Sequence, residues 1–174
     1  MTLLHSAALL WIVSTAAAQD FIPNRNIALQ GRATQSSIYS GTTSAINAVD
    51  GNLDSNFYHG SCSCTNIEVS PWWRVDLLRP HKISHIIITN RGDCCGERLN
   101  GARILVGNSL ENNGNNNPSC AEIRSIPNGG TKTFQCNNMV GQYVNIILQG
   151  KTNYLQLCEV QVYGVSESND HLCF

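Results

Sequence analysis

The chain has 174 residues, a formal net charge of −1 and only 13% charged residues. This near-neutral balance gives no electrostatic basis for binding nucleic acid or an anionic membrane surface. With 42% hydrophobic residues the chain can bury the core of one domain, and its 8 cysteines indicate a disulfide framework if it is exported.

Residues 1–18 have the pattern of a secretory signal. The stretch Leu9-Leu10-Trp11-Ile12-Val13 is apolar, and Ala16-Ala17-Ala18 offers a cleavage site of small residues. The apolar stretch is too short to span a membrane, and no second one follows it. We therefore expect a secreted protein without membrane insertion, composed of a signal peptide (1–18), one domain (19–165) and a C-terminal tail (166–174).

Short runs of alternating or β-branched residues then predict strands. In chain order these runs are 73–77, 82–89, 102–107, 131–136, 142–148 and 155–163, while only 44–49 is typical of a helical turn. Pairs such as Asn100-Gly101 and Gln149-Gly150 mark turns between them. Many short strands with Gly and Asn turns predict an all-β sandwich.

The most distinctive segment is 90–98, Asn-Arg-Gly-Asp-Cys-Cys-Gly-Glu-Arg. Arg91 and Arg98 carry rigid forks of hydrogen-bond donors, and Asp93 between them can hold both in place. If Cys94 and Cys95 bond to each other, they form a rigid ring with a flat apolar face. Donors beside an apolar plate suit a sugar with hydroxyls on one edge and a methyl group on another. The alternative is that the neighbouring cysteines bond to two distant partners.

This segment resembles the signature of the F-type lectins, the fucose-binding lectins known from fish and invertebrates. The signature is an arginine, an aspartate two places later and, after four more residues, an arginine or lysine; Arg91, Asp93 and Arg98 match it. Family-like segments also occur at 48–52, 55–60, 71–77 and 157–159. The resemblance implies the jelly-roll β-sandwich of the galactose-binding-like (discoidin-like) group.

One member of the signature is missing. The family has a histidine 27 places before the first arginine, and this chain has Cys64 there. His59 lies nearby, but it belongs to a Phe-Tyr-His-Gly run that family members carry in addition to the sugar-binding histidine. One of the three polar sugar contacts is therefore replaced by a thiol or by half a disulfide.

The resemblance also implies roles for the site residues. The two arginines donate to the ring oxygen and the axial hydroxyl region of α-L-fucose, the aspartate orients them, and the disulfide ring packs against one face of the sugar. Two aromatic residues border the sugar's methyl group, for which ordinary core packing is the alternative. In chain order the implied carbohydrate-binding set is Phe57, Tyr58, Cys64 (doubtful, since it is not a histidine), Arg91, Asp93, Cys94, Cys95 and Arg98.

The same resemblance implies three disulfides, Cys62–Cys158, Cys94–Cys95 and Cys120–Cys136. Cys64 and Cys173 remain outside this pattern. They can pair with each other, which would tie the C-terminal tail across the sugar site, or they can be free or link two chains.

A structural calcium ion is the expected cofactor. Calcium prefers several oxygen ligands, mostly carboxylates and carbonyls, and the family's calcium positions are all matched. The implied metal set is Asn47, Asp50, Asn52, Ser61, Cys158 and Glu159. Taken locally, Asp50-Gly51-Asn52 also fits an ordinary turn. We expect the ion to brace the structure rather than to bind sugar.

The sequence thus predicts a secreted lectin for L-fucose-containing glycans on cell or microbial surfaces, with a role in innate recognition or agglutination. Homo-oligomers are common among related lectins. The alternative is a lectin scaffold that has lost or changed fucose binding and serves as an extracellular interaction or structural protein. We expect no enzymatic activity, because the chain has neither a H-E-x-x-H nor a G-x-S-x-G motif.

Overall fold

The computed structural model describes residues 25–167, so the predicted signal segment and Cys173 lie outside the described residues. Within this range, no helix is long and apolar enough to cross a membrane. The strands are β1 (Arg32–Gln35), β2 (Ser63–Cys64), β3 (Glu68–Val69), β4 (Trp72–Thr89), β5 (Ala102–Gly107), β6 (Ser119–Ile123), β7 (Thr131–Ile147), β8 (Thr152–Asn153), β9 (Gln156–Leu157) and β10 (Glu159–Ser166). Short 3-10 helices connect them: η1 (Ile27–Gln30), η2 (Ala45–Val49), η3 (Phe57–His59), η4 (Gly96–Leu99) and η5 (Glu111–Gly114).

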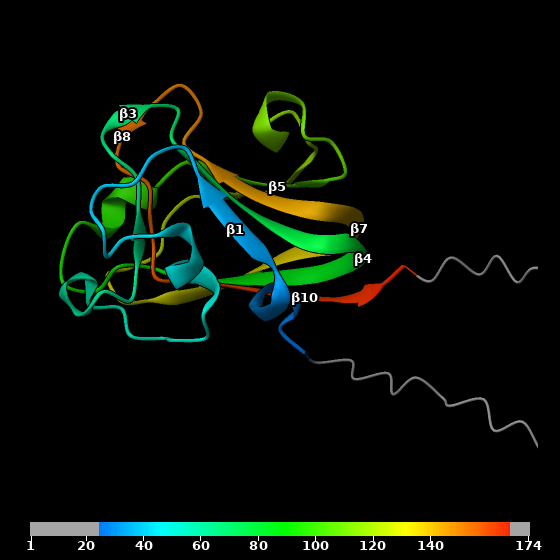
Figure 1. Ribbon diagram of the computed structural model, residues 1–174, viewed down its shortest axis with the longest axis horizontal. Helices are drawn as coiled ribbons and strands as arrows, with labels where there is room; N and C mark the ends of the chain where they lie inside the picture. Colours follow the sequence, from blue (N-terminus) through cyan, green and yellow to red (C-terminus); the bar gives the residue numbers. More distant parts are fainter. Residues whose placement is uncertain (1–24, 168–174) are drawn as a thin grey trace, which may run out of the picture.

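Two long antiparallel strands, β4 and β7, join the two layers of the molecule (Figure 1). The first arm of β4 pairs with β1 and with the end of β7, and β5 and β6 extend this layer. The second arm of β4 pairs with β10 on one side and with the start of β7 on the other. This antiparallel, two-layer arrangement is the β-sandwich that the sequence predicts.

The predicted strands 73–77 and 82–89 are the two arms of β4. The strand bends between Asp76 and His81, where its register against β7 shifts. At the bend Leu78 takes a left-handed conformation with φ 69°, and its N–H donates to Asp76 Oδ1 at 2.7 Å. In the same way, 131–136 and 142–148 are the two arms of β7. The sequence therefore located the arms but not the continuity of the strands.

The core lies between the layers and consists mostly of branched aliphatic side chains. Along the first arm of β4, buried and half-buried residues alternate, as a strand with one face in the core requires. Trp73 is buried there, and its Nε1–H donates to the carbonyl oxygen of Ala45 at 2.9 Å. That bond fixes η2, the predicted helical turn, against the sheet.

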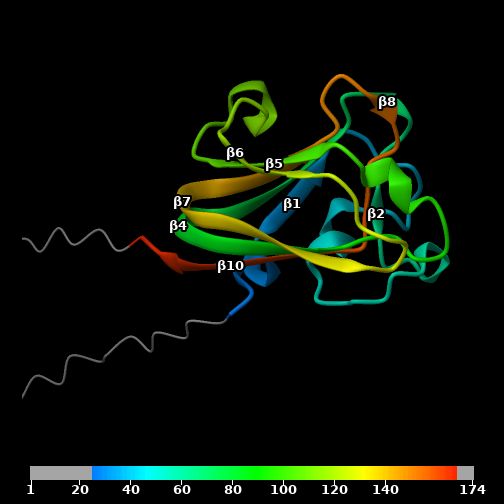
Figure 2. The same cartoon turned by 180° about the vertical axis from the view of Figure 1, so that it is seen from behind.

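Several loops gather at the end of the sandwich opposite the first and last described residues (Figures 1 and 2). At this end the two-residue strands β2 and β9 form a short antiparallel ladder. The Cys62–Cys158 disulfide lies at one end of the ladder and cross-links segments 96 residues apart. Short strands such as β2 and β9 were not predicted, because two residues give no periodicity. This end of the molecule carries the site.

Candidate sugar-binding site

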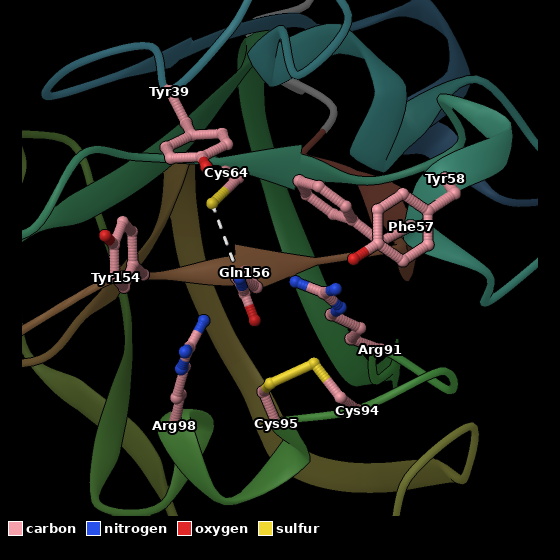
Figure 3. A pocket seen from close by; sticks show the side chains of 10 residues that line it. All are labelled: Tyr39, Phe57, Tyr58, Cys64, Arg91, Cys94, Cys95, Arg98, Tyr154 and Gln156. Carbon is pink, nitrogen blue, oxygen red and sulfur yellow. Dashed lines mark hydrogen bonds between the residues drawn. A yellow bond between two sulfur atoms is a disulfide. The ribbon is translucent and has the colours of Figure 1, made fainter.

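A cavity of about 310 Å³ opens among these loops. It brings together residues from five separate segments of the chain (Figure 3). Its walls are Tyr39, Phe57, Tyr58, Cys64, Arg91, Cys94, Cys95, Arg98, Tyr154 and Gln156. All predicted carbohydrate-binding residues line it except Asp93, which lies directly behind Arg91.

Arg91 is held rigidly although it lines an open cavity. Its Nε–H is 3.1 Å from both carboxylate oxygens of Asp93, and an Nη–H donates to Oδ2 at 2.6 Å. The guanidinium carbon lies 4.0 Å from the ring centroid of Phe57. Burial alone would lower the pKa of Arg91, but the Asp93 carboxylate outweighs it and raises the pKa, so this arginine stays charged.

Asp93 is a positioning group, as predicted, but for one arginine rather than both. In residues 25–167 its only ion pair is with Arg91, whose hydrogen bond lowers the pKa of the Asp93 carboxyl. The carboxylate also accepts the backbone N–H of Phe57 at 2.8 Å. Asp93 therefore ties the arginine to the aromatic residue stacked on it. The prediction that it also holds Arg98 is wrong.

Arg98 is fixed by different means. It lies in η4, and its guanidinium carbon is 4.8 Å from the ring centroid of Tyr154. The amide of Gln156 then joins the two arginines: oriented with Oε1 toward them, it accepts from Arg91 at 2.9 Å and from Arg98 at 3.1 Å. The opposite orientation, drawn in Figure 3, sets the amide N–H groups against the arginine N–H groups, so the surroundings require the first.

Cys94 and Cys95 are bonded to each other, which confirms the predicted vicinal disulfide and excludes two distant partners. Cys95 takes a left-handed conformation with φ 63° and directly precedes η4. The turn is secured by Asn90, which donates to the Gly96 carbonyl oxygen at 3.0 Å. The disulfide therefore forms an apolar wall of the cavity between the two arginines (Figure 3).

Phe57 and Tyr58 lie in η3 and line the cavity rather than the core. Tyr58 is 81% exposed and forms the rim, whereas Phe57 is half-buried beneath Arg91. Asn56 caps the turn by accepting the N–H of Tyr58 at 3.1 Å. Core packing, the alternative for these two residues, does not occur.

Cys64 is the residue that the sequence predicts in place of the family histidine. Its side chain lines the cavity but is only 1% exposed, and within the described residues it forms no disulfide. Burial raises the pKa of its thiol, so when Cys64 is unpaired it is a neutral S–H group. Pairing with Cys173 remains a prediction, since that residue is outside the described range. The other two predicted disulfides, Cys62–Cys158 and Cys120–Cys136, are present.

Three cavity residues, Tyr39, Tyr154 and Gln156, were not predicted from the sequence. One signal was available for Gln156. A Cys62–Cys158 disulfide between antiparallel strands places Cys64 opposite Gln156, and the ladder has this register. The two tyrosines come from irregular loops and pack edge to face with ring centroids 5.7 Å apart, which no local pattern indicates.

The predicted calcium residues lie beside the Cys62–Cys158 disulfide. Glu159 is fully buried, and neither of its carboxylate oxygens has a hydrogen-bond partner among residues 25–167. Burial, and then the charge of Asp50, raise its pKa to about 7; the Gly51 N–H acts weakly in the opposite direction, outside hydrogen-bonding geometry. Residues 25–167 contain no cluster of three His, Cys, Asp or Glu side chains placed to hold a metal. The predicted set has two carboxylates, with its other oxygens from amides, a hydroxyl and carbonyls.

Comparisons with known proteins agree with this geometry. Residues 47–146 match the model of the NedA-like, galactose-binding domain. The chain is 54% identical to fucolectin-1 of Anguilla japonica over 166 residues, which are 90% of this chain and 92% of that protein.

Solved structures extend this similarity. A fucolectin from the serum of striped bass, Morone saxatilis, matches with 50% identity and a TM-score of 0.79, covering 81% of this chain and 47% of that one, so the described protein spans about half of it. A Streptococcus pneumoniae fucose binding module matches with 28% identity and a TM-score of 0.71, covering 82% of this chain and all of that one. With this cavity, this fold and these relatives, the chain belongs to the F-type lectin (fucolectin) family.

Proposed function

We propose that this protein is a lectin that recognises L-fucose-containing glycans. The observation that carries the proposal is the pair of guanidiniums, Arg91 and Arg98, each stacked on an aromatic ring and both facing one cavity beside the vicinal disulfide. The names of its relatives, fucolectins and a fucose binding module, give the sugar.

The cavity can bind a neutral sugar because its donors are charged and already in place. Hydrogen bonds to charged groups contribute about 1.5–3 kcal/mol net, against about 0.5–1.5 kcal/mol between neutral groups. Asp93 and Gln156 hold the two guanidiniums before the sugar arrives, so little side-chain freedom is lost on binding. The disulfide and Phe57 offer apolar surface to the methyl group and to one face of the ring.

Cys64 is the residue that favours the alternative function, a lectin scaffold that has lost or changed fucose binding. A buried thiol is a weak donor, and loss of a histidine contact would cost about 1–3 kcal/mol, or roughly 5- to 150-fold in affinity. A single site is then weak, and tight binding to a glycan surface would rely on several sites acting together. The alternative, a scaffold that no longer binds fucose, rests on this one replacement.

We propose that calcium braces this end of the molecule. A buried carboxylate without a partner is costly, and in the part of the chain that the structure describes Glu159 has no hydrogen-bond partner while facing the charge of Asp50. A divalent cation held by these two groups, with oxygens of Asn47, Asn52, Ser61 and Cys158, would neutralise both charges. Because Ser61 and Cys158 flank or form the disulfide that fixes β2, the ion would stabilise the cavity wall without touching sugar.

Secretion and a part in innate recognition also belong to the proposal. They are supported by the signal pattern of residues 1–18, by three disulfides, and by a relative found in serum. Secretion is tested by expression in animal cells, after which the protein from the medium should begin at Gln19. A protein retained in the cells with Met1 would contradict it.

Fucose recognition is tested by retention on immobilised L-fucose. The oxidised protein should be held on L-fucose beads in calcium buffer and released by free L-fucose but not by D-galactose. An Arg98→Ala variant should pass through. Equal retention of the variant would assign the binding to another surface, and failure of the natural protein to bind would favour the scaffold without fucose binding.

A further inference from the structure

We infer that Gln156 is a third sugar-contacting residue, and that its amide supplies the hydrogen-bond donor that Cys64 does not. The inference rests on the proposed function, because it concerns the same cavity. It makes Gln156 a determinant of which sugar hydroxyl the site reads.

The first support is the register of the β2–β9 ladder. Cys64 and Gln156 are direct cross-strand partners, so their side chains leave the ladder on the same face. The Cys62–Cys158 disulfide lies two positions along the same two chain segments and fixes this pairing. A short side chain at position 64 leaves room for the long one opposite it, and Gln156 reaches the centre of the cavity (Figure 3).

The second support is the orientation of the Gln156 amide. Its oxygen accepts from Arg91 and Arg98, so its NH2 group is the opposite end of the same amide. In this orientation no described residue accepts a hydrogen bond from that NH2, although Gln156 is only 3% exposed and lines the cavity. That end of the amide is not among the buried groups without a partner, so it opens to the cavity, where an acceptor on a bound ligand can take the place of water.

The third support is that Cys64 has no donor to offer the ligand. Its sulfur is 3.3 Å from the carbonyl oxygen of Thr65 and 3.5 Å from the amide atom of Gln156 that faces the arginines. The single S–H proton therefore has two acceptors inside the protein. With the thiol proton used inside the protein, the NH2 group of Gln156 remains as the neutral donor beside the arginines.

This arrangement predicts what the ligand must present. The sugar needs one hydroxyl oxygen that accepts from the Gln156 NH2 group, next to the oxygens that accept from Arg91 and Arg98. Removing that hydroxyl should cost affinity only while the amide nitrogen is present. This defines a coupling between one protein group and one sugar group that can be measured.

The test compares the natural protein with Gln156→Glu, which keeps an oxygen for both arginines but replaces the NH2 group by a second oxygen. Both are titrated with methyl α-L-fucoside and with the analogues that each lack one ring hydroxyl. The variant should bind the parent sugar about five- to tenfold more weakly, and one of the deletions that weakens the natural protein should no longer weaken the variant. Gln135→Glu, an exposed position on β7, is the matched control for charge.

The outcomes distinguish failure of the proposed function from failure of the inference about Gln156. Natural protein that does not bind the fucoside overturns the proposed function and this inference with it. If the natural protein binds, equal affinity of Gln156→Glu, or the same losses for every deletion in both proteins, overturns the inference alone. The melting temperature and the retained disulfides verify folding; if Gln156→Glu is unfolded, Gln156→Met, uncharged and similar in length, takes its place in the same comparison.

Discussion

Arg91 and Arg98 are seven positions apart in sequence, yet different partners fix each of them. Among the described residues, Arg91 has a carboxylate, a neighbouring aromatic ring and a share of the Gln156 amide, whereas Arg98 has a ring and that amide. The site therefore holds two positive charges and one negative charge. The site thus consists of the rigid Arg91, the less constrained Arg98 and the Gln156 amide between them.

Asp93→Asn tests how much of the affinity depends on the rigid arginine. The amide keeps the size of the carboxylate but loses the charge that holds the guanidinium, so fucose affinity should fall about tenfold while stability changes little. Calorimetric titration measures the affinity. Glu97→Gln removes the same charge from an exposed neighbour and should bind like the natural protein; if both variants bind equally well, Asp93 does not position Arg91 for sugar.

Cys64→His tests the replaced member of the signature. A histidine restores a donor at this position, so fucose binding should strengthen by roughly fivefold or more. Cys64→Ser is the matched control, because its hydroxyl can still donate to the Thr65 carbonyl oxygen without reaching the sugar. Affinity of the histidine variant no higher than that of the serine variant would count against a role for this position.

At the scale of elements, the two disulfides near the cavity have different roles. Cys62–Cys158 joins segments 96 residues apart and fixes the β2–β9 register, whereas Cys94–Cys95 joins neighbours and closes no loop. Loop closure is what lets a disulfide stabilise a fold. One bridge should therefore matter for stability and the other for the shape of the sugar-binding surface.

Paired substitutions separate these jobs. Removing Cys62–Cys158 by serine substitutions should lower the free energy of unfolding by about 2–5 kcal/mol and the melting temperature by about 5–15 °C. Replacing Cys94 and Cys95 by serine should leave the melting temperature nearly unchanged and weaken fucose binding. Thermal unfolding and titration of each variant provide the data, and equal losses of stability would refute the distinction.

The sequence predicts these elements unevenly, for physical reasons. Short runs of alternating or β-branched residues identify the arms of β4 and β7, because burial of one face imposes a period of two. The bend at Leu78 is invisible in that pattern, since it depends on pairing with β7 after folding. Contiguous motif residues such as Arg91 and Arg98 are predicted, while Tyr39 and Tyr154 reach the cavity only through the tertiary fold.

At the scale of the whole molecule, an antiparallel sandwich supports an end that is built from irregular segments. The cavity is built there from loops, two-residue strands and 3-10 turns. Two disulfides lie in this end, and so does Glu159, the buried carboxylate without a partner among the described residues that we propose as a calcium ligand. The sandwich is thus the rigid base of the site, and the two disulfides fix the loops that form the cavity.

Removal of calcium with EDTA tests whether the ion stabilises the fold, and the raised pKa of Glu159 predicts how that effect changes with pH. Without metal, the folded pKa of Glu159 is about 7, above the unfolded value of about 4.3. The folded state then holds one extra proton across that window, so its stability falls as pH rises from about 4.5 to 7. Calcium needs the ionised carboxylate, so EDTA should lower the melting temperature more at about pH 8 than at about pH 5.5. An EDTA effect that is absent, or larger at the lower pH, would contradict this.

The central claim is that two pre-positioned arginines and a vicinal disulfide suffice for fucose recognition without the family histidine. The most direct measurement is a calorimetric titration of the purified, oxidised natural protein with L-fucose in calcium buffer, with D-galactose as the control. We predict saturable, weak binding of L-fucose and none of D-galactose at the same concentrations. No saturable heat with L-fucose would contradict the claim and identify Cys64 as the change that ended or redirected sugar binding.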